Sequence, residues 1–337
     1  MSILISEGKA KSGAALRIRI PRGIFGALLM AGVLSVVASA STPGCPDCPD
    51  WNNFNAWWDR YHPPASGPSS ESIRDQALKL RSQIEEKPTH DAEYVLPGLI
   101  VSSKEDIEGR VLLDARSPGD YQRGHLPGAM NLYWESLRPQ GTLDADLATM
   151  ELCRLGVEET DSIVVYGNGE DSAYLFWALE FLGHENLSRW DGDVEAYSDL
   201  KLVENAPVTE ESNYTSAARA GLLADESMLK EAWGNPGIQI VDARPSYSDR
   251  ATSRISNSMY FRTQDLYSDP NVRSLKGAEE LQNLFSAKGI DEGKVQVIYG
   301  SPEASILYFA LRTMGYRAAV IDGDWWQKTE YAVSSIS

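Results

Sequence analysis

The chain has 337 residues, of which 42% are hydrophobic and 23% charged, with a formal net charge of −17 at pH 7. This composition is typical of globular domains and excludes collagen, coiled coil and wholesale disorder. The negative charge argues against nucleic acid as a partner, because phosphate backbones select basic surfaces.

A basic segment followed by a short apolar run stands at the N-terminus. Residues 1–23 carry five Lys and Arg against one acid, and residues 24–40 read IFGALLMAGVLSVVASA. This order is typical of an export signal. A retained anchor formed by residues 24–40 and a buried helix stay open as alternatives, although the run is short for a membrane span. We therefore expect residues 1–40 to be a signal peptide or membrane anchor. The rest is then exported to the periplasm or another extracytoplasmic space, and contacts membrane only through this segment.

Residues 41–92 predict a tether with a short helical part, because Pro, Ser and Trp are frequent there. Cys45 and Cys48 could pair in an oxidising compartment. Aromatic residues between 51 and 61 recur at roughly helical spacing. That spacing favours a helix docking on the globular part over contact with a membrane interface or a partner. Three cysteines and four histidines in the whole chain exclude a disulfide framework, and we expect neither a metal nor a cofactor.

The remainder of the chain repeats itself. VLLDARSPGDY at 111–121 returns as IQIVDARPSYSD at 238–249, and GVEETDSIVVYG at 156–167 returns as GIDEGKVQVIYG at 289–300. A spacing of about 130 residues indicates two homologous domains rather than a solenoid. We place these domains at residues 93–203 and 213–335, joined by a polar linker.

Each copy alternates short apolar runs with helical patterns. Residues 111–115 and 163–167 are rich in apolar and β-branched residues and stop at Gly or beside Asp, which predicts strands. Residues 145–155 and 172–182 predict helices, and the second is apolar almost all round, so we expect it to be deeply buried. Strand–helix alternation predicts an α/β fold with a parallel-stranded sheet flanked by helices, and sites at the edge where the strands end.

The motifs of both copies have a recognisable order. Asp114-Ala115-Arg116 precedes Asp120-Tyr121 and the run GHLPGAMN at 124–131, and each copy ends in Asp-Gly-Asp, at 191–193 and 322–324. This order resembles the rhodanese family, in its tandem two-domain form, over about residues 94–335. The second copy departs from the family pattern, with SRISNS at 253–258 where G-H-I-P-G-A is expected. The resemblance implies sulfur transfer from thiosulfate or 3-mercaptopyruvate. In the family, a loop cysteine between a strand and a helix takes up the sulfur as a persulfide.

Both positions at which the resemblance places this cysteine hold glycine. The loops read Gly-Asn-Gly-Glu-Asp-Ser at 167–172 and Gly-Ser-Pro-Glu-Ala-Ser at 300–305. Their acids should stabilise the start of the following helix and repel an anion, which predicts capped helix starts in place of an anion cradle. We expect Asp114–Arg116 and Asp242–Arg244 to hold strand ends through charge-assisted bonds, with contact to an anion as the alternative. The candidate binding residues are Gly167, Asn168, Gly169, Ser172, Gly300, Ser301, Ser305, Arg116 and Arg244.

Three hypotheses about function follow. The first is an exported tandem rhodanese-fold protein without sulfurtransferase activity, a pseudoenzyme acting as a binding or regulatory module. Its partner would be an unidentified protein or a small sulfur-containing anion. The second is a sulfurtransferase that uses a displaced thiol, such as Cys48, or a thiol supplied by a partner. The third is unrelated chemistry in a cleft between the domains. Cys153 is predicted to be a small buried side chain on a helix.

Overall fold

The computed structural model describes residues 93–194 and 200–334. The predicted signal or anchor at 1–40 and the predicted tether at 41–92, with Cys45 and Cys48, lie outside the described residues. Within the described ranges, no helix combines the length and the apolar character that a membrane span requires. We use "first repeat" for residues 93–203 and "second repeat" for residues 213–334, excluding the undescribed residues 195–199.

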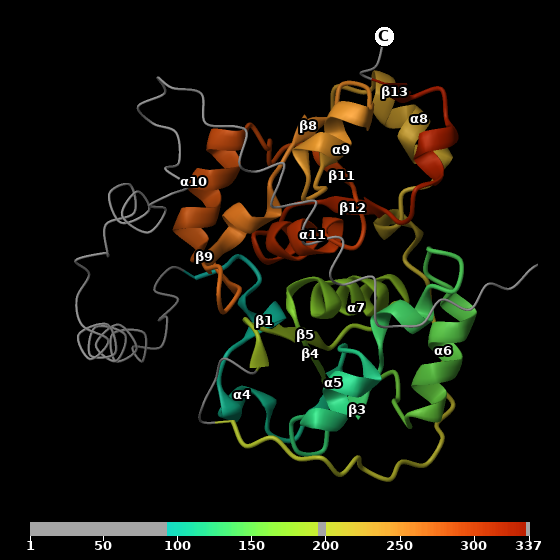
Figure 1. Ribbon diagram of the computed structural model, residues 1–337, viewed down its shortest axis with the longest axis vertical. Helices are drawn as coiled ribbons and strands as arrows, with labels where there is room; N and C mark the ends of the chain where they lie inside the picture. Colours follow the sequence, from blue (N-terminus) through green and yellow to red (C-terminus); the bar gives the residue numbers. More distant parts are fainter. Residues whose placement is uncertain (1–92, 195–199, 335–337) are drawn as a thin grey trace, which may run out of the picture. The chain divides into compact units, whose positions relative to one another are not determined.

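The first repeat contains a five-stranded sheet in the order β1-β5-β4-β2-β3, in which every neighbouring pair is parallel. Its strands are β1 (Ile100–Val101), β2 (Val111–Asp114), β3 (Met130–Asn131), β4 (Ile163–Tyr166) and β5 (Leu187–Trp190). Its helices are α4 (Lys104–Ile107), α5 (Pro118–Arg123), α6 (Ala145–Arg154) and α7 (Gly169–Phe181), with short 3-10 turns η1 (Pro97–Leu99) and η2 (Trp134–Leu137). The strands predicted at 111–115 and 163–167 are confirmed as β2 and β4 (Figure 1).

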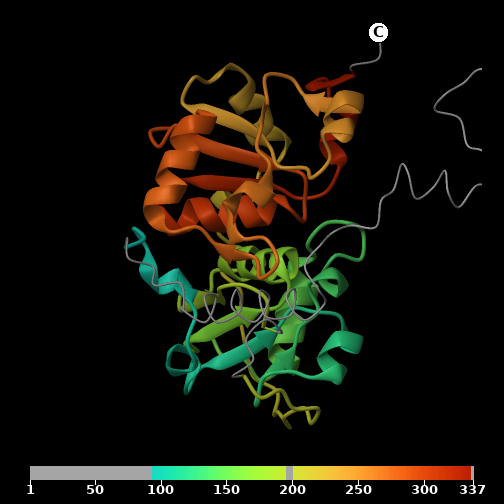
Figure 2. The same cartoon turned by 60° about the vertical axis from the view of Figure 1, so that its left-hand side comes forward.

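The second repeat contains a parallel four-stranded sheet in the order β12-β11-β6-β8. Its strands are β6 (Ile238–Asp242), β8 (Met259–Tyr260), β11 (Val295–Tyr299) and β12 (Ala318–Ile321). Two antiparallel pairs lie outside this sheet: β7 (Ser253–Ile255) with β13 (Ala332–Ser334), and β9 (Tyr267–Asp269) with β10 (Ser274–Leu275). Its helices are α8 (Glu226–Gly234), α9 (Tyr247–Thr252), α10 (Ala278–Lys288) and α11 (Ala304–Thr313), with 3-10 turns η4 (Ala220–Leu222), η5 (Thr263–Leu266) and η6 (Trp325–Lys328). The predicted α/β class, with parallel-stranded sheets flanked by helices, is therefore confirmed (Figure 2).

Local sequence explains where many of these elements begin. Five of the described helices start after a Ser or Asp whose side chain accepts a backbone N–H of the first turn, which satisfies a donor that the helix itself leaves unpaired. These residues are Ser103, Ser117, Asp144, Asp225 and Ser246. The central strand β4 reads Ile-Val-Val-Tyr and is buried at every position, as expected of a strand covered on both faces.

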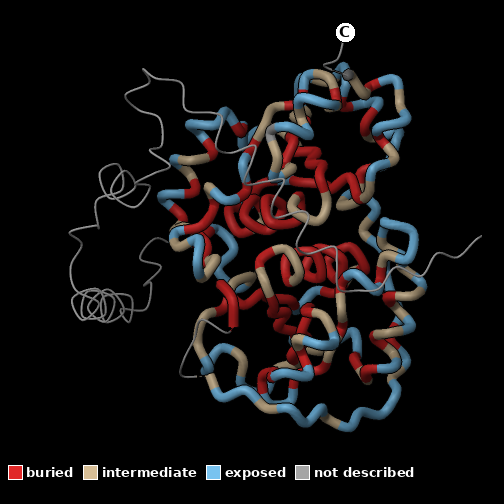
Figure 3. Tube along the Cα trace, viewed as in Figure 1, coloured by how far each residue is buried: buried red, intermediate tan, exposed pale blue. Residues whose placement is uncertain are grey.

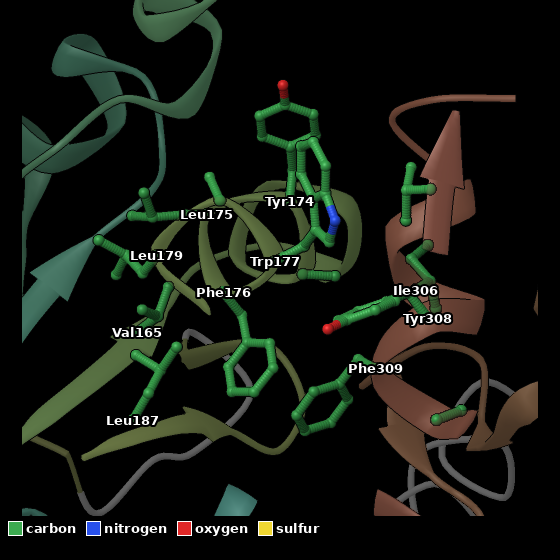
Figure 4. Packing of buried hydrophobic residues seen from close by; sticks show 14 of the residues in the cluster. Val165, Tyr174, Leu175, Phe176, Trp177, Leu179, Leu187, Ile306, Tyr308 and Phe309 are labelled. Carbon is green, nitrogen blue, oxygen red and sulfur yellow. The ribbon is translucent and has the colours of Figure 1, made fainter. Parts of the chain in front are cut away.

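Helices α7 and α11 pack against each other across the two repeats. Residues 172–181 of α7 and 304–311 of α11 are all buried, so the predicted deep burial of 172–182 is confirmed for the part that is helical (Figure 3). Phe176 and Phe309 meet edge to face with ring centroids 4.9 Å apart (Figure 4). Because most side chains of both helices are buried, each helix helps to exclude water from the other, and the two repeats share one hydrophobic core.

A buried carboxylate lies at the end of this helix pair. Glu180 of α7 is 5% exposed. It accepts hydrogen bonds from Tyr308 Oη at 2.7 Å and from Arg312 Nε at 3.0 Å, both on α11. A charge that is removed from water in this way requires such partners, because desolvation would otherwise disfavour the folded state.

We predict that Glu180→Ala lowers the free energy of unfolding by about 3–5 kcal/mol, because it leaves the Arg312 guanidinium partly buried without its carboxylate. Urea-induced unfolding at pH 7 measures the change. Glu185→Ala is the matched control, since Glu185 is 82% exposed and lies 3.5 Å from Arg219. That variant should lose no more than about 1 kcal/mol. Equal losses in the two variants would contradict this interpretation of the helix pair.

Candidate functional site

The two candidate loops occupy equivalent places in the two sheets. Gly167 follows β4 and leads into α7, and Gly300 follows β11 and leads towards α11. In each sheet the neighbouring strand ends in the Asp of the Asp-Ala-Arg motif, in register with the loop's preceding Tyr. Arg116 therefore lies beside the first loop and Arg244 beside the second, at the carboxyl ends of the strands.

A side chain at Gly167 or Gly300 would force neighbouring atoms to move. A Cβ built on Gly300 would lie 2.5 Å from Cγ and 2.9 Å from the backbone nitrogen of Arg244, at a φ of +103°. At Gly167, where φ is +150°, the nearest atom would be Cγ of Arg116 at 3.3 Å. L-residues rarely adopt these φ values. At position 300 both the backbone conformation and the lack of space therefore favour glycine. The arginine of the motif fills the space that a side chain there would need.

The Asp–Arg pair of the first repeat holds the strand end, as predicted. Asp114 and Arg116 are both buried, with Nη2 of Arg116 2.6 Å from Oδ2 of Asp114. The same Nη2 donates to the carbonyl oxygen of Gly124 at 2.8 Å. Tyr166 accepts the backbone N–H of Leu126 at 3.1 Å, so the strand end is tied to the segment after α5 by two separate bonds.

The second repeat has the same arrangement. Nη2 of Arg244 lies 2.7 Å from Oδ2 of Asp242 and donates to the carbonyl oxygen of Ser253 at 2.7 Å. Tyr299 donates to Asp242 at 2.8 Å and accepts the backbone N–H of Ile255 at 3.2 Å. Both guanidinium groups therefore donate hydrogen bonds to the carboxylate and carbonyl oxygens of the protein itself. A contact between Arg116 or Arg244 and an anion stays a prediction.

The serines of the two loops are turned inward. Ser172 is fully buried and donates to the carbonyl oxygen of Asn168 at 3.1 Å, while accepting Nε of Arg189 at 2.9 Å. Ser305 is also fully buried and donates to the carbonyl oxygen of Pro302. Ser301 is half-buried, and its hydroxyl donates to the carbonyl oxygen of Ile321 at 3.3 Å. These bonds fix the loop backbone, and binding of a ligand by these serines stays a prediction.

A buried arginine beneath the first loop was not found from the sequence. Arg189 of β5 is 2% exposed, and Nη2 donates to the carbonyl oxygen of Gly169 at 3.2 Å. Its guanidinium lies over the ring of Phe309, 5.0 Å from the centroid. Burial lowers the pKa of Arg189. A single arginine within an otherwise ordinary strand pattern gives no signal that it will support a loop from below.

The first loop is also covered from above by the second repeat. A Cβ on Gly169 would lie 2.7 Å from Oη of Tyr267 and 3.1 Å from Cδ of Arg273, on the segment that contains β9 and β10. Arg273 holds this segment in place through ion pairs with Asp193 at 2.8 Å and Glu170 at 3.4 Å. An approaching anion would meet this cover and these carboxylates before it reached the loop.

Each Asp-Gly-Asp turn receives a segment from the other repeat. In the first turn, Asp191 accepts the backbone N–H of Leu275 at 2.8 Å. In the second, Asp322 accepts Nη2 of Arg138 at 2.9 Å and Oη of Tyr174 at 2.8 Å. The contacts run in both directions between the repeats, so both loops lie beside an interface that is already filled by protein.

The acids of the loops are partly buried, which alters their protonation. Burial, with a smaller effect of Glu170, raises the pKa of Asp171 to about 6. Nε1 of Trp134 donates to Asp171 at 2.7 Å. Burial also raises the pKa of Glu303. The predicted capping of these two helix starts is wrong, because neither Asn168 nor Glu303 makes a side-chain hydrogen bond to the first turn of its helix. Glu170 and Asp171 nevertheless lie in the first turn of α7.

Cys153 is the cysteine that the described ranges contain. It lies on α6, as predicted, but it is half-buried rather than fully buried. Its Sγ donates to the carbonyl oxygen of Tyr214 at 3.3 Å. Residues 93–194 and 200–334 contain no group of His, Cys, Asp and Glu that could hold a metal ion. Because Cys153 contacts Tyr214, the described part of the chain brings no thiol to either loop.

We predict that protonation of Asp171 stabilises the fold as the pH falls from 7 to 5. Asp171 has a pKa of about 6 in the fold and near 4 in the unfolded chain. At this group the folded state therefore binds more protons in this range, and its contribution to the free energy of unfolding rises as the pH falls. Burial lowers the pKa of His184, which acts in the opposite direction, so the test compares variants: the free energy of unfolding at pH 5 relative to pH 7 should be lower in Asp171→Asn than in wild type. Asp146→Asn, at an exposed position on α6, is the control. An identical change between pH 7 and 5 in wild type and Asp171→Asn would contradict the assignment.

Comparison with known proteins finds a matching family model and related sequences. The family model described as "Rhodanese-like domain" matches residues 101–200. A protein of Synechococcus elongatus named "Putative thiosulfate sulfurtransferase" is 28% identical over 259 residues, covering 67% of this chain and 78% of that protein. A protein with the same name from Haloferax volcanii is 28% identical over 240 residues, covering 61% and 80% respectively.

Solved structures share the fold. The crystal structure of SseA from Escherichia coli, a 3-mercaptopyruvate sulfotransferase, has a TM-score of 0.57 at 22% identity and covers 74% of this chain and 97% of that one. The structure of YnjE has a TM-score of 0.62 at 16% identity and covers 82% of this chain and 80% of that one. At these identities the likeness concerns the fold alone. The chain therefore carries a rhodanese-like domain at residues 101–200, within a structure that has the rhodanese fold.

Proposed function

We propose that this protein is an exported tandem rhodanese-fold protein that lacks sulfurtransferase activity and acts as a binding or regulatory module. The observation that carries the proposal is the closure of the second loop. Residues 299–305 contain no cysteine, and a Cβ at Gly300 would lie 2.5 Å from Cγ of Arg244. A thiol nucleophile at this position would need the arginine of the motif to move away from Asp242.

The charges around the loops support the same proposal. A reactive thiol requires an accessible, electropositive environment that stabilises the thiolate. Here Glu170, Asp171 and Glu303 stand at the starts of α7 and α11. Arg273 is held between Asp193 and Glu170. Such a site disfavours thiosulfate and other sulfur anions, so we favour a protein over a small anion as the partner.

The N-terminal sequence supports a location outside the cytoplasm. The basic stretch 1–23 and the apolar run 24–40 have the order of an export signal, and a retained membrane anchor is the alternative. The two possibilities differ in the mass of the mature protein. Cleavage leaves a chain that begins after Ala40, whereas an anchor keeps residues 1–40.

We predict that the protein isolated from its natural host begins at Ser41, because the small residues before this position suit a signal peptidase. Intact-mass measurement and sequencing of the N-terminal peptide provide the test. An N-terminus at residue 1 or 2, with the protein in the membrane fraction, would show the anchor instead. A full-length protein in the cytoplasm would contradict export altogether.

A sulfurtransferase that uses a displaced or partner-supplied thiol is the second candidate. It is favoured by the relatives named "Putative thiosulfate sulfurtransferase", which align over most of their own length. Cys45 and Cys48 lie outside the described residues, and Cys153 faces the backbone of Tyr214. The two candidates differ in whether any cysteine of the purified protein is needed for turnover.

We predict that the purified full chain does not transfer sulfur from thiosulfate to cyanide, in an assay run beside an active rhodanese. Gly300→Cys should not restore transfer, and it should lower the free energy of unfolding by roughly 1–3 kcal/mol through overpacking against Arg244. Gly167→Cys is the matched variant, with a nearest contact of 3.3 Å and a smaller expected loss.

The outcomes of this assay separate the two candidates. Turnover by the wild-type chain that disappears when Cys45, Cys48 and Cys153 are all replaced by Ser would support the displaced-thiol enzyme. Turnover that appears only in Gly300→Cys would show that the loop still accepts a substrate. The first result would contradict the non-enzymatic proposal, and the second would contradict the closure of the second loop on which the proposal rests.

A further inference from the structure

A hollow of about 480 Å³ opens in the second repeat, away from both loops. It lies between the C-terminal end of α8, the start of β6 and the turn before β8, and its lining includes Trp233, Ile238 and Met259. This is the amino end of β6, whereas Gly300 follows the carboxyl end of the neighbouring parallel strand β11. Its volume lies within the range of about 300–1,000 Å³ that is usual for pockets that bind small molecules.

The walls of this hollow are fixed by local bonds. Oδ1 of Asn235 accepts the backbone N–H of Gly237 at 2.8 Å, which shapes the turn between α8 and β6. On the other wall Asn257 adopts a φ of 59°, in a turn that the backbone N–H of Ser258 closes on the carbonyl oxygen of Ile255 at 3.2 Å. Walls held in this way keep their shape without a ligand, which lowers the cost of binding one.

The second wall belongs to the segment in which this chain departs from the family motif. Ser256 and Asn257 stand within SRISNS at 253–258, where G-H-I-P-G-A is expected. The corresponding segment of the first repeat keeps the motif, and its Leu126 and Ala129 are buried. The hollow is therefore lined by residues that differ from the motif of the first repeat.

The lining carries no charged side chain, in a protein whose formal net charge is −17. An ion bound there would lose water without gaining a counter-charge. Three side chains have polar groups that make no hydrogen bond within the described part of the chain: Trp233, Ser256 and Asn257. They offer an indole donor, a hydroxyl, and an amide that both donates and accepts. Hydroxyl groups on a ligand would match all three.

Trp233 gives the hollow an apolar surface. The side chain is 41% exposed, and its ring lies 5.1 Å from that of Tyr331 at an angle of 50°. A large exposed aromatic ring that is held by a second ring presents an apolar face at little entropic cost. The combination of this face with hydroxyl and amide groups suits a compound that has C–H groups on one side and hydroxyls at its edge.

We propose that the hollow is a binding site for an uncharged saccharide, with the sugar ring against Trp233 and its hydroxyls on Ser256 and Asn257. The site uses neither loop, so the proposal does not depend on whether the protein transfers sulfur. It gives the second repeat a ligand of its own, at the opposite ends of the strands from the family's site.

The full chain can be tested with glucose, N-acetylglucosamine and maltose in saturation-transfer NMR, followed by titration calorimetry. Glucose 6-phosphate and adenosine serve as the charged and the aromatic comparison compounds. We expect at least one uncharged sugar to bind in the millimolar range or tighter, and Trp233→Ala to weaken it about tenfold or more. Ser256→Leu, which fills the hollow, should abolish binding.

Met150→Ala is the control for loss of an exposed apolar side chain, since Met150 is 58% exposed on α6 of the first repeat. Thermal unfolding confirms that each variant is folded. The proposal is overturned by the absence of binding for all three sugars, or by equal affinity in wild type and Trp233→Ala. Preferential binding of glucose 6-phosphate or adenosine would overturn the ligand class.

Discussion

The ion pair between Asp242 and Arg244 determines what the second loop can do. It ties the end of β6 to the carbonyl oxygen of Ser253 and places the aliphatic part of Arg244 against Gly300. The Arg244 guanidinium moves only at a substantial cost, because the fully buried carboxylate of Asp242 would then lose this partner. The strand end is therefore firmly held, and the loop beside it keeps little space. The first repeat has the same ion pair, with a less crowded glycine.

The two repeats depend on each other through the helices that follow these loops. Helices α7 and α11 are buried over most of their length, and they pack against each other around Phe176 and Phe309. Glu180 and the Asp-Gly-Asp turns add polar bonds in both directions across the same interface. The first turns of α7 and α11 thus lie beside residues of the other repeat. The contacts between the two repeats give the fold a doubly linked frame, which can support a binding site elsewhere on its surface.

Much of the frame could be predicted because its signals are local. Runs such as Ile-Val-Val-Tyr stop at glycine, and their repetition identified the strand and loop of each copy. The ion pairs of Asp114 and Asp242 could be inferred because motif and strand end coincide. The cover of the first loop by Tyr267 and Arg273 could not, since those residues lie far along the chain and only packing between repeats brings them together. The same holds for Arg189, which stands in an ordinary strand, and for the hollow beside Trp233, whose walls come from three separate elements.

The central claim is that no thiol of this protein accepts sulfur. The most direct measurement is the intact mass of the full, reduced chain after incubation with thiosulfate and, separately, with 3-mercaptopyruvate, under conditions that preserve persulfides. We expect an unchanged mass, while an active rhodanese treated in parallel gains one sulfur atom. Addition of a sulfur atom that maps to Cys45, Cys48 or Cys153 in a peptide digest would contradict the account.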